Sequence, residues 1–232
     1  MTTGQIIAAR GVTRRFGGLV ALDNIDLDVP TGIVQAIIGP NGSGKTTLVN
    51  LVSGLDHPDR GLIALGARRL DRLPPDRIAC AGVARSFQSP VPPDGMAPVD
   101  LVVAALAAKR GVAGFGPAAA LGPLRTQAAG LLGRTDRPDI ARALALDPAI
   151  LLLDEPAAGL DAEERDRLRS LLRALAGEGR GLLVIEHDMA FLMGLVDRVA
   201  VLLDGRIAHV GAPDAIRAEP AVRAAYLGDA PC

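Results

Sequence analysis

A glycine-rich segment that ends in lysine and threonine is the part of the sequence best suited to chemistry. Residues 39–46 read Gly-Pro-Asn-Gly-Ser-Gly-Lys-Thr and match the phosphate-loop pattern GxxxxGK[ST]. Glycines let backbone N–H groups turn inward around phosphate oxygens, and a following helix adds positive potential. We expect Lys45 to reach the β- and γ-phosphates of a nucleotide and the Thr46 hydroxyl to bind Mg²⁺. The alternative is a glycine-rich turn that contains Lys-Thr by chance.

An acidic pair follows an apolar run farther along the chain. Residues 149–153 read Ala-Ile-Leu-Leu-Leu and lead into Asp154 and Glu155. A phosphate loop needs a carboxylate that holds Mg²⁺ at the end of a neighbouring buried strand, and Asp154 stands where that carboxylate belongs. Glu155 is then placed to polarise a water molecule in line with the γ-phosphate. The alternative is that Asp154 only caps a turn, because Asp-Glu-Pro is favourable turn chemistry.

The apolar pattern predicts the strands and helices around these groups. Short extended runs predict an antiparallel β lobe over residues 5–32, followed by a buried strand over 33–38 and a helix from Lys45 to Gly54. Residues 89–139 are rich in Pro, Gly and Ala, with one good helical stretch between Val99 and Arg110, and predict a reduced helical insertion. From Ile140 onward helices and strands alternate, which favours a parallel sheet. We expect one α/β domain over 1–232 with a P-loop NTPase (RecA-like) core.

Composition excludes several other classes of protein. The 232 residues are 49% hydrophobic and 22% charged, which argues against disorder, and no window approaches 18 consecutive apolar residues. We therefore expect neither a membrane span nor export. The net charge of −1 offers no basic field for nucleic acid. Cys80 and Cys232 are the only cysteines, too few for a disulfide framework and consistent with the cytosol.

Several short segments together resemble the ATPase subunits of ABC transporters, with the closest likeness to the branched-chain amino acid importer group. The likeness covers nearly the whole chain. It is carried by RFGGLVAL near the start, GVARSFQ at 82–88, IARALALDP, LLLDEPAAGLD, VIEHDM and AAYLG near the end.

The resemblance implies roles for four further residues. Phe16 would stack on adenine, and Gln88 would link the magnesium site to a transmembrane partner. Asp161 would bridge to the opposite subunit, and His187 would sense the γ-phosphate. The alternatives are a core or staple role for Phe16, a surface-loop position for Gln88 and a satisfied strand-edge position for His187. We expect His57 and His209 to be structural.

The chain departs from the family at its signature segment, which is of the type LSGGQ. Residues 130–138 occupy the aligned position, where only Gly133 fits, Leu131 replaces the serine and Arg134 replaces the glutamine. Pro138 is accepted only in a first helical turn, so we expect Asp136 to be the N-cap of a helix that starts late. We expect the subunit to bind ATP normally while its signature serves a partner's ATP poorly, which favours a heterodimer.

These inferences predict an ATP-hydrolysing importer subunit for branched-chain or related amino acids that uses ATP and Mg²⁺. The partners would be integral membrane permease subunits and a second ABC ATPase subunit, without nucleic acid, at the inner face of the cell membrane. The alternatives are a non-transport ABC protein and a hydrolysis-impaired regulatory subunit. The predicted catalytic residues are Glu155, His187 and Gln88; the nucleotide contacts are Phe16, Gly39, Pro40, Asn41, Gly42, Ser43, Gly44, Lys45, Thr46, Thr47, Gly133 and Asp161; and the metal contacts are Thr46, Gln88 and Asp154.

Overall fold

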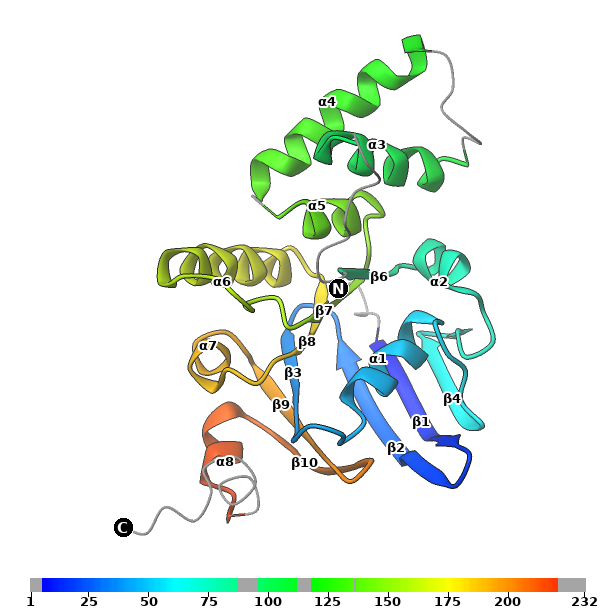
Figure 1. The fold of residues 1–232 in the computed structure, drawn as a ribbon, viewed down its shortest axis with the longest axis vertical. Coiled ribbons are helices and arrows are strands. Elements are labelled where there is room, and N and C mark those ends of the chain that lie inside the picture. Colours follow the sequence, from blue (N-terminus) through cyan, green and yellow to red (C-terminus); the bar gives the residue numbers. More distant parts are fainter. Residues whose placement is uncertain (1–5, 87–95, 112–117, 136, 221–232) are drawn as a thin grey trace.

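A six-stranded sheet forms the centre of the molecule. The computed structural model describes residues 6–86, 96–111, 118–135 and 137–220 (Figure 1). In sheet order the strands are β10 (Arg206–Gly211), β9 (Arg198–Leu203), β3 (Val34–Ile38), β8 (Gly181–Ile185), β7 (Ile150–Asp154) and β6 (Val83–Ser86). All neighbouring pairs are parallel except β10 with β9. The parallel sheet expected from the alternating pattern is therefore confirmed.

Helices cover one face of this sheet. Alternate side chains of β3, β7, β8 and β9 point into a core shared with four helices. The four are α5 (Pro138–Ala145), α6 (Ala162–Gly177), α7 (Met189–Met193) and α8 (Pro213–Ala218). Strands β3 and β8 are buried throughout, as expected of parallel strands covered on both faces.

A second, antiparallel sheet lies over the opposite face. Its strands are β2 (Leu19–Pro30), β1 (Ile6–Phe16), β4 (Arg60–Leu65) and β5 (Arg68–Arg69), in that order. Its apolar side chains share a core with α1 (Lys45–Ser53) and α2 (Pro75–Ala81). The structure thus adds β4 and β5, from beyond residue 32, to the β lobe that the sequence predicts.

Three helices gather at one end of the molecule. Helices α3 (Pro98–Lys109), α4 (Ala118–Arg134) and α5 pack around a separate small core, with α3 and α4 at the far end from β10 (Figure 1). Helix α3 coincides with the helical stretch predicted between Val99 and Arg110. The 17-residue α4 is missing from the sequence expectation because Pro123 lies inside it and removes a backbone donor.

Candidate functional site

The glycine segment runs from the end of β3 into α1, and close backbone contacts explain two of its glycines. A Cβ on Gly39 would lie 2.2 Å from the carbonyl oxygen of Leu202. Gly44 has a φ of 104°, and a Cβ there would lie 2.6 Å from the carbonyl oxygen of Ala21. Since no larger side chain fits at either point, the loop is held tightly against β9 and β2.

Lys45 begins α1 and folds back over the loop. Its amine donates hydrogen bonds to the carbonyl oxygens of Gly39, at 2.7 Å, and Pro40, at 2.9 Å. Burial lowers the pKa of Lys45 below its ordinary value, while the negative charges of Glu155 and Asp154 oppose that shift. The lysine and the acidic pair therefore share one electrostatic environment, as the sequence predicts.

One cavity of about 470 Å³ brings most of the predicted residues together. Its lining contains ten of them: Phe16, Asn41, Gly42, Gly44, Lys45, Thr46, Thr47, Asp154, Glu155 and His187. Gly39 and Pro40 contribute the carbonyls that hold Lys45, and Ser43 is buried in the same loop. The cavity thus contains an anion-binding loop, carboxylates and an aromatic ring.

Asp154 closes β7, and its carboxylate is paired with an arginine that sequence reasoning missed. Arg85 Nη2 lies 2.7 Å from Asp154 Oδ2, and Arg85 Nη1 donates to Asn50 Oδ1 at 2.7 Å. Arg85 on β6 therefore connects the end of β7 to α1. Arg85 belongs to the segment GVARSFQ, but its contact with Asp154 becomes evident only from the pairing of β6 with β7.

The oxygen groups of the cavity fit Mg²⁺. The Thr46 hydroxyl and the Asp154 carboxylate both line it. Mg²⁺ usually keeps several waters and takes one or two carboxylates plus phosphate oxygens. Among the residues that the structure describes, no group of three or more His, Cys, Asp or Glu could hold a metal. A magnesium ion at Thr46 and Asp154 would therefore need phosphate oxygens or water as further ligands.

Glu155 and His187 approach each other across the cavity. Glu155 has a φ of 45°, a left-handed conformation that is strained for a glutamate, and strain of this kind clusters at functional sites. Its backbone N–H donates to the Ile185 carbonyl at 2.9 Å. His187 Nδ1 lies 3.6 Å from Glu155 Oε1, and the imidazole is 68% exposed. The two side chains stand beside open space that a ligand can enter.

Phe16 is an exposed ring at the rim of the cavity. It is 48% exposed, which rules out the core role that its residue type alone suggested. The Arg14 guanidinium lies 4.8 Å from the ring centroid and is paired with Asp56. The guanidinium lies over the Phe16 ring, and a ring held in this way is suited to stacking on an aromatic base.

Asp161 and Gly133 lie away from this cavity and from the glycine loop. Asp161 is the N-cap of α6, where its side chain accepts from the Glu164 N–H in a capping box. Gly133 lines a separate hollow of about 340 Å³ beside Arg134 and Thr135. Gln88 lies outside the described residues, so its predicted contacts with the metal and a partner stay a prediction.

The expected N-cap of α5 is corrected by the structure. The helix begins at Pro138 in its first turn, but its N-cap is Arg137 rather than Asp136. Arg137 pairs with Asp139 and donates to the Pro156 carbonyl at 2.6 Å, so a longer side chain fixes the helix start to the loop after Glu155. Gly133 lies in the last turn of α4.

The cavity also contains residues that the sequence did not single out. They are Leu19, Val20, Ala21, Ile185, Glu186, Asp204 and Gly205. Asp204 and Gly205 were visible only as a hairpin turn between β9 and β10. Glu186, 2% exposed, is a buried carboxylate within the segment VIEHDM, and the sequence alone predicts no role for it.

Known proteins with similar sequences point to one family. The family model described as ABC transporter matches residues 22–158. The chain is 37% identical to the sulfate/thiosulfate import ATP-binding protein CysA of Mycolicibacterium paratuberculosis, over 92% of its own length and 61% of that protein. It is 36% identical to the high-affinity branched-chain amino acid transport ATP-binding protein BraF of Pseudomonas aeruginosa, over 97% of its length and 98% of BraF.

A solved structure supports the fold. A nucleotide-free ATP-binding cassette from an ABC transporter superposes with a TM-score of 0.85 at 24% identity, covering 97% of this chain and all of that one. The predicted P-loop NTPase fold is thereby confirmed. Within the described part of the chain, no helix has both the length and the apolar character needed to cross a bilayer.

Proposed function

The chain belongs to the ABC transporter family, and we propose that it is the ATP-binding and ATP-hydrolysing subunit of an importer. The observation that carries the proposal is the single cavity shared by Lys45, the Asp154–Glu155 pair and the Phe16 ring. A nucleoside triphosphate presents an anionic end, a metal-binding stretch and an aromatic base. The three groups of the cavity correspond to these parts.

The phosphates would lie against the glycine loop and the start of α1. Lys45 would exchange the carbonyls of Gly39 and Pro40 for phosphate oxygens, whose negative charge favours its protonated form. Thr46 and Asp154 would hold Mg²⁺, which would offset charge on the phosphates. Phe16 would carry the adenine.

Hydrolysis would depend on the pair beside the γ-phosphate. Glu155 would orient the attacking water and accept its proton. His187, 3.6 Å from that carboxylate, would contact the γ-phosphate and keep the glutamate directed at the water. The strained backbone of Glu155 holds the carboxylate toward the cavity before nucleotide arrives.

Two subunits would close head to tail around two nucleotides, with Gly133 and Asp161 facing the partner's site. Gly133 lies in the last turn of α4, where its N–H is in position to bond along the helix rather than to a phosphate. This observation favours a heterodimer in which the partner supplies the better signature. It also keeps open a second function, a regulatory subunit that binds ATP and hydrolyses it poorly.

The permease would dock in an apolar groove of about 780 Å³ between the helical end and the central sheet. The groove is lined by α2, β6, α3 and α5, and includes Cys80, Leu101, Ala105 and Leu146. Three residues of β6 line it, and β6 ends two residues before Gln88 in the sequence. The chain spans 61–65% of the sulfate importer relatives but 98% of BraF, which favours branched-chain or related amino acids as cargo.

Lys45 provides the direct test of nucleotide binding, because the sequence contains a natural control. Lys109 is the only other lysine and lies in a surface ion pair with Asp147. We expect Lys45→Ala to weaken Mg·ATP binding at least about tenfold by titration calorimetry, since it removes a charge-assisted phosphate contact. Lys109→Ala should leave affinity unchanged. Equal affinity in both variants would contradict the proposal.

A substitution at Glu155 should distinguish ATP binding from ATP hydrolysis. Glu155→Gln keeps the size of the side chain but removes the base, so we expect Mg·ATP affinity to be retained while phosphate release falls about 10²–10⁴-fold. Glu163→Gln, on an exposed face of α6, is the matched control. An affinity that falls as far as the turnover would show that Glu155 is a binding residue instead.

A further inference from the structure

The buried carboxylate of Glu186 has no part in the proposed reaction, yet it is hydrogen-bonded to the segments that carry Glu155 and His187. It is 2% exposed and follows β8 directly, with His187 next in the chain. A buried glutamate is costly unless its oxygens are hydrogen-bonded. What its oxygens bind therefore indicates what the residue does.

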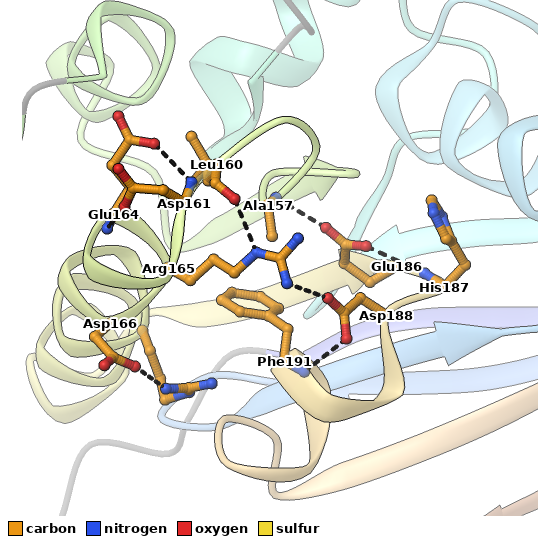
Figure 2. A network of polar contacts seen from close by, with 11 residues as sticks. Ala157, Leu160, Asp161, Glu164, Arg165, Asp166, Glu186, His187, Asp188 and Phe191 are labelled. Atoms are coloured by element: carbon orange, nitrogen blue, oxygen red, sulfur yellow. Dashed lines mark hydrogen bonds and ion pairs between the residues drawn. The ribbon is translucent and has the colours of Figure 1, made fainter.

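Each oxygen of Glu186 accepts a backbone hydrogen bond from a different catalytic segment. Oε1 accepts from the Ala157 N–H at 2.8 Å, two residues after Glu155. Oε2 accepts from the His187 N–H at 3.2 Å. Figure 2 shows the carboxylate between these two donors.

The contact continues the pairing of two strands beyond their ends. Strands β7 and β8 pair as far as Asp154 and Ile185, and the Glu155 N–H still reaches the Ile185 carbonyl. At the next donor, Ala157, the Glu186 side chain is the acceptor in place of a backbone carbonyl. A side chain thus keeps the two segments together after the regular ladder stops.

A second contact ties the same two segments farther out. Arg165 on α6 donates to the Leu160 carbonyl at 3.1 Å and to Asp188 Oδ2 at 2.7 Å. Asp188 is the N-cap of α7, where it accepts from the Phe191 N–H. The loop over 155–161 and the turn over 186–188 are therefore joined at an inner and an outer point (Figure 2).

We propose that Glu186 is a positioning residue that makes the Glu155 loop and the His187 turn move as one unit. The inference rests on the proposed roles of Glu155 and His187 in ATP hydrolysis. Contact of His187 with the γ-phosphate would then be conveyed to Glu155 through the backbone, and through the same loop to Asp161 at the partner's site. Arg165 and Asp188 support this unit from the outside.

Amide hydrogen exchange tests the geometry without requiring turnover. In Glu186→Ala we expect faster exchange in both the 155–160 and the 186–190 segments than in the wild-type chain. Asp28→Ala, which removes an exposed ion-paired carboxylate on β2, is the control and should change neither segment. Faster exchange in one segment alone, or in neither, would overturn the proposal.

Kinetics of the purified full chain test the consequence. We expect Glu186→Ala to lower kcat about tenfold or more while Mg·ATP affinity stays within about twofold, because only the reacting groups are misplaced. Glu186→Gln keeps one acceptor oxygen, so its kcat should lie between the kcat of Glu186→Ala and that of the wild type. In a chain that already carries His187→Ala, adding Glu186→Ala should lower kcat little further, as expected for residues that act together.

The outcomes distinguish this inference from the proposed function. A wild-type chain that binds and hydrolyses ATP, with an unchanged kcat in Glu186→Ala, would overturn the inference and leave the function standing. Loss of affinity that matches the loss of kcat would also overturn it, because that result indicates general damage. A wild-type chain without affinity for Mg·ATP would overturn the function itself, while the exchange experiment would still decide whether Glu186 joins the two segments.

Discussion

Phe16 is the residue whose exposure most needs a functional explanation. A half-exposed aromatic ring costs free energy in water, and here it stands at the rim of the cavity with Arg14 on one face. In the proposed complex the adenine occupies the other face. The ring then contributes affinity for the base and has no part in the chemistry.

We therefore expect Phe16→Ala to weaken Mg·ATP binding, by about 1 kcal/mol for a lost stacking contact, or roughly fivefold in Kd. Phe16→Trp should retain the affinity, and kcat at saturating ATP should change little in either variant. Val210→Ala, which shortens another exposed apolar side chain, is the control for nucleotide titrations. A fall in kcat with unchanged affinity would place Phe16 in the reaction instead.

The residues that could be predicted at the site lie either in contiguous patterns, as Lys45 and Asp154 do, or in segments that resemble the family, as Phe16 and His187 do. Lys45 lies in an eight-residue motif, and Asp154 ends an unbroken apolar run, so strand pairing alone brings them to one cavity. Arg85 and Glu186 were not predicted, because their roles depend on contacts between segments that are distant in sequence. Arg85 and Asp154, for example, are 69 residues apart. Residue type cannot reveal such a partner before the register of the strands is known.

Among the elements, the segment that follows β5 provides a test of stability that is separate from the nucleotide site. Asp71 is almost fully buried and accepts hydrogen bonds from Arg69 and from the Ile63 N–H. The hydrogen bond from Arg69 lowers the pKa of Asp71 below its ordinary value, against the opposing effect of burial. The folded state therefore favours the charged carboxylate.

We expect Asp71→Asn to lower the free energy of unfolding at pH 7 by about 1–3 kcal/mol, the usual effect of disrupting a buried charged acceptor. The pKa of Asp71 is lower in the folded than in the unfolded chain. The extra free energy of unfolding of the wild-type chain is therefore present above about pH 4 and is lost as the pH falls below it. Urea denaturation at several pH values measures this difference. A difference that grows on acidification would contradict the assignment.

The elements were predicted well where the apolar pattern is regular and poorly where packing outweighs local preference. Strands β3 and β8 are wholly buried, so their apolar runs were unambiguous. Helix α4 contains Pro123, yet Leu124 and Ala128 are buried against α3 and α5 and stabilise it. The start of α5 was expected at an Asp136 cap, whereas the Arg137 contact with the Pro156 carbonyl sets it.

One chain holds only part of the groups that the proposed ATPase cycle needs, and a second subunit would supply the rest. The glycine loop and acidic pair are complete in one chain, while the signature segment departs from the family and Gly133 lies inside α4. The sequence indicated this imbalance because the departure is in the residue types themselves. It could not identify the cargo, because none of the residues assigned a role would touch it.

We expect the ATPase rate of the purified chain to rise several-fold when its cognate partner ATPase subunit is added, since in the proposed heterodimer the partner would supply an intact signature to this chain's site. Steady-state phosphate release from the chain alone, the partner alone and the mixture measures the effect. A chain that turns over alone as fast as in the mixture would exclude the asymmetric dimer. Copurification with an integral membrane protein separates the importer from a non-transport ABC protein.

A crystal structure of Glu155→Gln with Mg·ATP would show whether one triphosphate is held jointly by the glycine loop and the acidic pair. We expect Lys45 Nζ to leave the carbonyls of Gly39 and Pro40 for phosphate oxygens, and the metal to contact Thr46 and Asp154. A triphosphate bound elsewhere, with Lys45 still bonded to both carbonyls, would contradict this expectation.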